Sequence, residues 1–397
     1  MRSALAVTIS LLLLSGCSWF GDKEDEATKP AELASIKQEI QLTPLWKKGI
    51  GGTPRDRASR LVPAISGGRV FAASADGNIA AMEPGNGRVI WEVKVESFYT
   101  SDDRKNAFAK KSDAITGGVG VAGDLILVGT FAGEIVALNQ SDGSLAWRAR
   151  TTSEVLAPPR GDRALVIAQS IDGKVAAFDA LDGTRRWIYS TSVPSLTLRG
   201  TATPIVTSEF VAAGFANGRV ILFDRERGLA GVDRRIASPQ GKSDLERLVD
   251  IDGQMVFTGE MLLAVSYQGN LAALDVKNGQ ELWSVAASST AGLAAGFGNV
   301  YVAQADGRLT AYEQSTSKQM WENAALAYRE LSTPATISSY IAVGDFEGYL
   351  HLIAQSDGRF VSRRKVDSDP LRAPAVVDGS RLYVMTGNGR LEAFELR

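Results

Sequence analysis

The sequence repeats one short pattern along most of its length. A glycine that opens an apolar run, as in Asp76–Glu83 (DGNIAAME) and Asn388–Glu395 (NGRLEAFE), occurs eight times at matching points of the repeat. The anchor glycines are Gly77, Gly133, Gly173, Gly218, Gly269, Gly307, Gly348 and Gly389. Their spacing averages about 45 residues, which is typical of propeller blades. The repeat therefore predicts a chain of similar β-sheet units.

Each repeat also has a regular internal order. Five repeats carry an Asp-Gly or Asn-Gly pair, such as Asn86-Gly87, that ends ten residues after the anchor, and such pairs accept the positive φ angles of tight hairpins. Fourteen residues after the anchor, five repeats place a tryptophan, whereas Val232 and Ser362 replace it in two others. These tryptophans are Trp91, Trp147, Trp187, Trp283 and Trp321. Their constant phase predicts packing between neighbouring four-stranded antiparallel blades.

The last repeat is short by one strand. The chain ends at Arg397, eight residues after Gly389, so no sequence follows for an outermost strand. A segment of the right kind, Thr43–Lys48 with Trp46, lies near the other end of the chain. If this segment completes the eighth blade, no sheet edge stays open at the junction. We therefore predict an all-β fold, an eight-bladed β-propeller closed by an N-terminal strand, with an open solenoid of repeats as the alternative.

The N-terminus resembles a targeting sequence. Arg2 precedes an apolar stretch that is too short to span a bilayer comfortably, and Leu14–Cys17 (LSGC) is similar to a bacterial lipobox. We expect residues 1–16 to be a lipoprotein signal peptide, Cys17 to be lipidated, residues 17–41 to be a flexible tether and residues 42–397 to be the propeller. The alternative is an ordinary signal peptide with a chance cysteine. By analogy with enterobacterial sorting, Ser18 after the cysteine favours the outer membrane.

Composition excludes several classes of function. The formal net charge of −2 argues against a nucleic-acid partner, because phosphate binding needs a basic surface. Cys17 is the sole cysteine, which leaves no internal disulfide and no cysteine-based metal site. His351 is the sole histidine, so a Ser-His-Asp hydrolase would require it as the base. Because most other repeats carry Ala, Val, Ile or Thr at this position, we expect His351 to have a structural or surface role.

The repeat pattern Gly-x-[Val/Leu/Ile]-x-Ala-[Leu/Phe]-[Asp/Asn] with Asp-Gly and Trp after it resembles that of pyrroloquinoline-quinone propellers. Together with the lipobox, it is similar to the BamB family of lipoproteins of the outer-membrane β-barrel assembly machinery. Two stretches carry the resemblance most specifically, Ser192–Gly200 (SVPSLTLRG) and Glu246–Asp252 (ERLVDID), and Val343–Leu350 also looks like the family. The chain departs from the family pattern at Gly253-Gln254-Met255, where we expect a Thr-Pro-like strand start.

The resemblance implies a function and a set of contacts. It implies a non-catalytic scaffold on the periplasmic face of the outer membrane, which binds the periplasmic POTRA region of BamA and aids insertion of outer-membrane proteins. It implies partner contacts by Leu196, Leu198, Arg199, Asp250 and Asp252. Unfolded outer-membrane proteins are a further expected partner. No catalytic, metal-binding or cofactor-binding residue is expected.

Position in the repeat independently brings the two stretches together. Each follows the outermost strand of one blade and leads to the innermost strand of the next, and such connections emerge on one face of a propeller. The leucines then form an exposed apolar patch, and Arg199 with the two aspartates forms a polar rim or an ion pair. The alternative is that the leucines fold inward over the blade ends and the aspartates make turns.

Two other functions stay open at this point. One is a quinone-dependent dehydrogenase with a Ca²⁺-held cofactor in the central channel, for which the sequence lacks the adjacent cysteines often found there. The other is a generic envelope propeller that binds a small ligand or a sugar. We assign no function to the polar insertion from Glu96 to Ser112.

Overall fold

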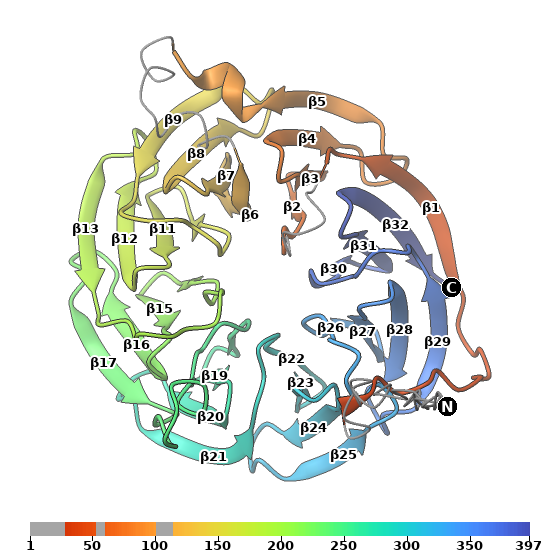
Figure 1. Cartoon of the computed structure of the whole chain (residues 1–397). Helices are drawn as coiled ribbons and strands as arrows, with labels where there is room; N and C mark the ends of the chain where they lie inside the picture. Colours follow the sequence, from red (N-terminus) through yellow and green to blue (C-terminus); the bar gives the residue numbers. More distant parts are fainter. Residues whose placement is uncertain (1–27, 53–59, 101–113) are drawn as a thin grey trace, which may run out of the picture.

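The computed structural model describes residues 28–52, 60–100 and 114–397. Within them the strands form eight four-stranded antiparallel sheets, which stand as blades around a ring (Figure 1). This confirms the predicted eight-bladed propeller. Cys17, Ser18, the signal peptide and most of the 96–112 insertion lie outside the described residues. Among the described residues, no helix has the length and apolar character needed to cross a membrane.

The first four blades each run from their innermost to their outermost strand in chain order. Blade one contains β2 (Ala64–Ser66), β3 (Arg69–Ala73), β4 (Asn78–Met82) and β5 (Val89–Lys94). The short 3-10 helix η2 (Val95–Phe98) follows β5. Blade two contains β6 (Ile115–Ala122), β7 (Leu125–Thr130), β8 (Glu134–Asn139) and β9 (Leu145–Arg150). Blade three contains β10 (Arg160–Gly161), β11 (Leu165–Ser170), β12 (Lys174–Asp179) and β13 (Arg185–Ser190). Blade four contains β14 (Ile205–Val206), β15 (Phe210–Gly214), β16 (Arg219–Asp224) and β17 (Ala230–Arg235).

The other blades repeat this order, except for the last. Blade five contains β18 (Val256–Phe257), β19 (Met261–Val265), β20 (Gly269–Asp275) and β21 (Glu281–Ala287). Blade six contains β22 (Leu293–Gly296), β23 (Asn299–Ala303), β24 (Leu309–Glu313) and β25 (Gln319–Asn323). Blade seven contains β26 (Ala335–Ile337), β27 (Tyr340–Gly344), β28 (Tyr349–Ala354) and β29 (Phe360–Lys365). Blade eight contains β30 (Val376–Asp378), β31 (Arg381–Met385), β32 (Arg390–Leu396) and, as its outermost strand, β1 (Leu42–Gly49).

The N-terminal strand closes the ring as the sequence predicts. β1 pairs antiparallel with β32, from Leu42 opposite Leu396 to Gly49 opposite Arg390. Figure 1 shows this strand running along the outside of the final blade. The pairing covers the edge of β32 that would otherwise offer its backbone groups to another chain.

The tryptophans join neighbouring blades, which confirms their predicted role. Trp91 of blade one donates its Nε1–H to the backbone oxygen of Gln140 in blade two at 2.9 Å. Its indole lies on the hairpin turn at Gly143, where a Cβ atom would sit 2.7 Å from the ring. Gly143 also has a φ of 74°, so both backbone shape and contact favour glycine there.

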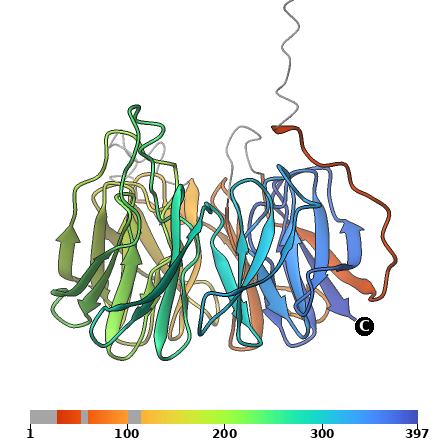
Figure 2. The same ribbon diagram turned by 90° about the horizontal axis from the view of Figure 1, so that it is seen from below.

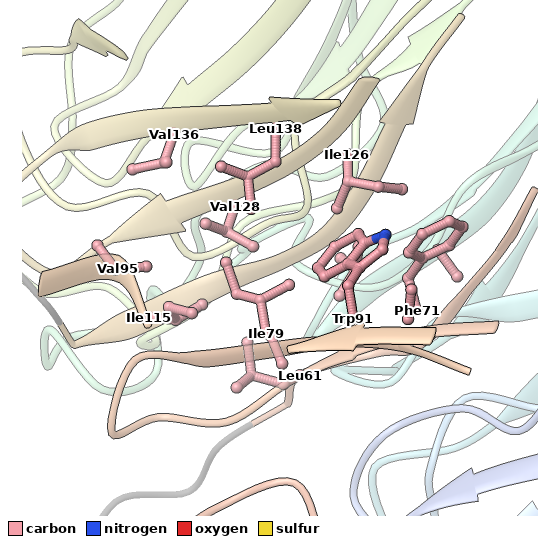
Figure 3. Close-up of a cluster of buried hydrophobic side chains, with 14 of the residues drawn as sticks. Leu61, Phe71, Ile79, Trp91, Val95, Ile115, Ile126, Val128, Val136 and Leu138 are labelled. Atoms are coloured by element: carbon pink, nitrogen blue, oxygen red, sulfur yellow. The ribbon is translucent and has the colours of Figure 1, made fainter. Parts of the chain in front are cut away.

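Apolar side chains fill the space between blades. In the junction of blades one and two, Trp91, Phe71 and Ile79 face Ile126 and Val128 (Figure 3). All five are buried, the last four completely. Because the inner and middle strands bury both faces against such neighbours, each blade contributes to two interfaces of the ring.

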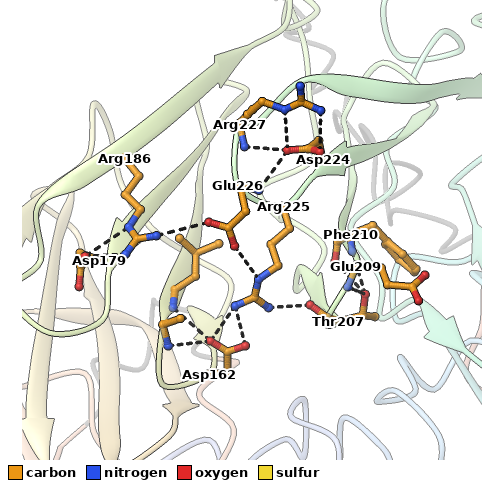
Figure 4. Close-up of polar contacts among 12 residues, drawn as sticks. Asp162, Asp179, Arg186, Thr207, Glu209, Phe210, Asp224, Arg225, Glu226 and Arg227 are labelled. Atoms are coloured by element: carbon orange, nitrogen blue, oxygen red, sulfur yellow. Dashed lines mark hydrogen bonds and ion pairs between the residues drawn. The ribbon is translucent and has the colours of Figure 1, made fainter.

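Ionic contacts join blades three and four at the hairpin turns on one end of these blades. Arg225, which is buried, places a guanidinium nitrogen 2.6 Å from an oxygen of Asp162 and donates to the backbone oxygen of Thr207 at 2.7 Å (Figure 4). Arg186 contacts Asp179 in its own blade and Glu226 in the next. This network lies at the end of the blades opposite to the loops that follow β13 and β17.

Part of the predicted tether contacts blade seven and the turn before it. The backbone N–H of Ala31 donates to the oxygen of Ala327 at 2.9 Å. Two arginines hold the same segment, because Arg329 donates to the oxygen of Ala31 at 2.9 Å and Arg363 donates to the oxygen of Ala34 at 2.7 Å. Figure 2 shows this segment on the outside of the ring, leading from the side with the long interblade loops towards β1.

Further contacts continue along the same segment. The backbone N–H of Glu39 donates to Val361 at 2.8 Å, and the Glu39 carboxylate pairs with Arg359 at 3.0 Å. Leu33 and Ile40 pack against apolar clusters of the propeller. Residues 31–41 therefore follow the outer surface of blade seven over a continuous path.

His351 is buried within blade seven, in agreement with the predicted structural role. Its Nε2 lies 3.0 Å from Asp345 Oδ2, and Arg363 Nε donates to its Nδ1 at 3.1 Å. Burial lowers the pKa of His351, although Asp345 opposes the shift. A neutral imidazole that donates to Asp345 and accepts from Arg363 satisfies both ring nitrogens.

Candidate partner-binding site

Two long interblade loops contact each other on one face of the propeller. We call residues 191–204, between β13 and β14, the leucine loop, and residues 236–255, between β17 and β18, the aspartate loop. Both follow the outermost strand of a blade, and Figure 2 shows them rising on the same side of the ring. The predicted proximity of the two stretches is therefore confirmed.

A buried carboxylate joins the two loops. Asp250 has 1% of its surface exposed, and its Oδ2 accepts a short hydrogen bond from the backbone N–H of Leu198. Its Oδ1 has no hydrogen-bond partner among the described residues. Asp252 is also buried and lies against Gly200, where a Cβ atom would be 2.6 Å from the carboxylate. Both aspartates therefore support the leucine loop from below.

The leucine loop presents its apolar side chains to different degrees. Leu196 is 42% exposed and Val193 is 38% exposed, whereas Leu198 is half-buried. An exposed leucine on a loop held by buried polar contacts is available to a partner without refolding of the loop. The inward-folded alternative holds for Leu198 in part and fails for Leu196.

Arg199 pairs with Glu154 and not with either aspartate, contrary to the ion pair considered above. Its Nη2 lies 2.6 Å from Glu154 Oε1, in the loop between blades two and three. Glu154 is buried, while the Arg199 side chain is 55% exposed. The ion pair holds one nitrogen of the Arg199 guanidinium, and much of the Arg199 side chain stays at the surface. The leucine loop is thus held on one side by blade two and on the other by the aspartate loop.

The departure at Gly253-Gln254-Met255 has a local structural reason. Gln254 forms a parallel bridge to Gly292 in the loop before blade six. A Cβ atom at position 253 would lie 2.4 Å from the backbone of Gly292, so glycine permits this close approach. Met255 is buried, and strand β18 begins directly after it. The aspartate loop is therefore fixed at its end by the next blade.

Leu245 is an exposed apolar residue that the sequence analysis did not single out. It lies in the aspartate loop and is 63% exposed. Glu246 holds the surrounding turn, because its carboxylate accepts backbone hydrogen bonds from Lys242 and Ser243 at 2.7 Å and 3.0 Å. The signal was present in the sequence as one leucine between Asp244 and Glu246 in a polar stretch.

Both aspartates have raised pKa values. Burial raises the pKa of Asp250 to about 6, opposed by the hydrogen bond from Leu198. Burial and then the field of Asp250 raise the pKa of Asp252 to about 7, opposed by Arg60. The ionised form of both carboxylates is therefore destabilised in the folded state. The folded protein binds protons at these two side chains more tightly than the unfolded chain does.

Replacing Asp252 with a neutral residue is expected to stabilise the fold in a pH-dependent way. Below about pH 4 Asp252 is protonated in both the folded and the unfolded state, so its charge has no effect on stability. As the pH rises through about 7, the buried carboxyl group loses its proton, and the cost of this buried charge lowers the free energy of unfolding. We expect Asp252→Asn to raise the free energy of unfolding at pH 8 by on the order of 3 kcal/mol and to have little effect at pH 4. Urea unfolding at both values tests this. Destabilisation at pH 8 with little change at pH 4 would show instead that the carboxylate is required as an anion.

No metal site accompanies these loops. In the part of the chain that the structure describes, no group of three or more His, Cys, Asp or Glu side chains is arranged to hold a metal ion.

Comparison with known proteins places this chain in one family. A family model described as outer membrane protein assembly factor BamB matches residues 41–112 and 75–323. The chain is 42% identical over 386 residues to the outer membrane protein assembly factor BamB of Pseudomonas aeruginosa, with 97% of both proteins covered.

Solved structures agree with this assignment. The crystal structure of BamB from Moraxella catarrhalis superposes with a TM-score of 0.79 at 29% identity, covering 89% of this chain and 100% of that one. Quinohemoprotein alcohol dehydrogenase from Comamonas testosteroni matches with a TM-score of 0.67 at 15% identity, covering 90% of this chain and 76% of that one, which shows a shared fold alone. The chain belongs to the BamB family of outer membrane protein assembly factors.

Proposed function

We propose that this protein is a non-catalytic scaffold of the outer-membrane β-barrel assembly machinery, which binds the periplasmic POTRA region of BamA through the leucine loop. Leu196 and Arg199 supply the contact, Leu198 supports it, and Asp250 and Asp252 position the loop. The relatives named as assembly factors support the role in assembly. Insertion of outer-membrane proteins then benefits because the ring holds the machinery, and unfolded clients, near the membrane.

One observation carries the proposed contact. The Asp250 carboxylate binds the backbone N–H of Leu198 while Leu196, two residues earlier, stays exposed. A loop that is ordered before binding loses little conformational entropy when a partner arrives, so an exposed leucine and a half-free guanidinium contribute more of their contact energy to affinity. Arginine is enriched among the residues that dominate protein interfaces, and an exposed apolar patch beside it marks an interaction site.

The proposal extends to the anchor. The lipobox-like Leu14–Cys17 supports acylation at Cys17 and attachment to the outer membrane on its periplasmic face. Residues 31–41 lead away from the face that carries both loops (Figure 2).

Capture of the partner tests the function directly. The lipidated full chain, extracted from membranes in mild detergent, is expected to retain the purified periplasmic region of BamA on an affinity resin. Mass spectrometry of an envelope extract treated in the same way should recover the other assembly subunits. If neither experiment yields BamA, the contact assigned to the leucine loop is wrong.

A further inference from the structure

A cavity of about 520 Å³ lies at the centre of the ring, on the inner side of the blades. Its walls come from the loops before the innermost strands and from those strands themselves, which surround the ring centre in Figure 1. The charged side chains that line it are Arg60, Arg160, Arg199, Arg372, Asp252 and Glu330. Four cations therefore share this space with two carboxylates.

Two of the four arginines are neutralised by carboxylates. Arg372 pairs with Glu330 at 2.8 Å, and Arg199 pairs with Glu154 at 2.6 Å. Ion pairs of this kind satisfy the guanidinium and leave little net charge for a ligand. The excess positive charge of the cavity must come from the other two.

Arg60 and Arg160 have no carboxylate partner among the described residues. Arg60 donates one long hydrogen bond, of 3.4 Å, to the backbone oxygen of Thr290. Arg160, in the innermost strand of blade three, makes no side-chain hydrogen bond or ion pair in the described part of the chain. Surrounding protein groups displace part of the water around both residues and lower the pKa of each. Arg60 is nevertheless exposed and Arg160 is half-buried, so both guanidinium groups can be reached from the cavity, and each can donate two N–H groups to an anion.

The carboxylate of Asp252 compensates Arg60 only partly. Asp252 is the acid whose field acts on Arg60, and the pKa of Asp252 is raised to about 7. Near neutral pH it is therefore protonated in a large fraction of the molecules. The rest of the wall is mixed, with threonine and glutamine side chains among apolar ones such as Leu156 and Met255. Such a lining suits a small organic molecule with one charged end.

We propose that the central cavity binds a small organic anion through Arg60 and Arg160, with a carboxylate or a phosphate as the recognised group. A planar guanidinium offers two parallel N–H donors to either group, and these two arginines line the same cavity from different parts of the ring. The cavity volume falls in the range of small-molecule sites. Neither arginine belongs to the leucine loop, although Arg199 and Gly200 of that loop form part of the cavity wall.

Isothermal titration of the full chain with inorganic phosphate and, separately, with succinate tests the proposal. We expect at least one probe to bind with a dissociation constant below about 1 mM. Arg160→Gln is expected to weaken that binding at least tenfold, and Arg160→Lys to restore part of it. Arg308→Gln is the matched control, because Arg308 pairs with Asp306 and Glu322 away from the cavity. Arg60→Gln provides a second variant in case Arg160→Gln does not fold.

Three outcomes would overturn the proposal. The first is that neither probe binds. The second is binding that Arg160→Gln and Arg60→Gln leave unchanged. The third is binding only at tens of millimolar with no preference for the parent over the variants, which would indicate an adventitious ion only. Thermal unfolding provides an independent test of binding. We expect the probe to raise the melting temperature of the parent and of Arg308→Gln, but not that of Arg160→Gln.

Discussion

Deleting residues 42–49 is expected to convert this protein from a folded ring into an aggregating, largely unfolded chain. The deletion removes β1 and leaves the backbone groups of β32 unpaired along the blade edge. It also removes Leu42, which is buried, and Trp46, whose Nε1–H donates to Pro84 in blade one at 2.9 Å. Loss of one large core side chain costs about 3–5 kcal/mol, and a domain is stable by about 5–15 kcal/mol in total. The ring junction therefore carries a large share of the stability.

Size-exclusion chromatography and thermal unfolding measure this effect. Trp46→Ala alone should lower the melting temperature while leaving a folded monomer, because the strand pairing with β32 persists. Lys47→Ala, an exposed position on the same strand, is the matched control and should leave the melting temperature unchanged within error. A deletion variant that stays monomeric and melts like the parent would show that β1 does not close the ring.

The second large effect concerns capture of BamA. Leu196→Ala combined with Arg199→Ala is expected to weaken binding of the periplasmic region by about tenfold to a hundredfold, because a few side chains, arginine often among them, carry most of the binding energy of an interface. The fold should survive, since Leu196 is 42% exposed and the Arg199 side chain is 55% exposed. Surface-plasmon resonance with immobilised lipidated chain measures the affinity.

A matched double variant controls for general loss of surface leucine and arginine. Leu181→Ala with Arg227→Ala removes two exposed side chains at the turns that begin the outermost strands of blades three and four. Those turns lie at the opposite end of β13 and β17 from the two long loops. Unchanged affinity is expected for this control. If both double variants weaken capture equally, the binding face is not the one assigned here.

The repeat made most of the fold predictable. The repeats share an anchor glycine, and most of them add a second turn and a tryptophan at constant spacing. The two turns indicate hairpins, and the tryptophan indicates one contact that such a repeat makes with the next. Both features can be recognised within a short segment of sequence. The closing strand was predictable for a different reason, because the last repeat lacked one strand and Trp46 lay in a spare segment of the same kind. These inferences need no knowledge of how distant residues meet.

The site was less predictable, because its decisive contacts join residues that are distant in sequence. Asp250 binds the backbone of Leu198 across 52 positions, and Arg199 pairs with Glu154 across 45. A backbone N–H has no sequence signature, and many acids lie at such separations, so charge pattern alone pointed to the wrong partner for Arg199. The position of both loops in the repeat predicted their common face, whereas the burial of both aspartates could not be read from the sequence.

The path of residues 31–41 along the propeller could not be predicted from the sequence for the same reason. Their composition is polar and resembles that of a linker, yet Arg329 and Arg363 bind the backbone oxygens of Ala31 and Ala34. These contacts span about three hundred positions and use backbone oxygens, which every residue type supplies. The same limitation applies to the central cavity, whose four arginines come from separate parts of the chain.

Hydrogen exchange on the complex with the periplasmic region of BamA tests the central claim most directly. Compared with the free chain, amides in residues 192–200 and 246–252 should exchange more slowly, while the Asp-Gly turns at the opposite ends of the blades stay unchanged. Slower exchange confined to those turns, or no change in either loop despite saturation with the partner, would contradict the assignment of the leucine loop as the contact surface.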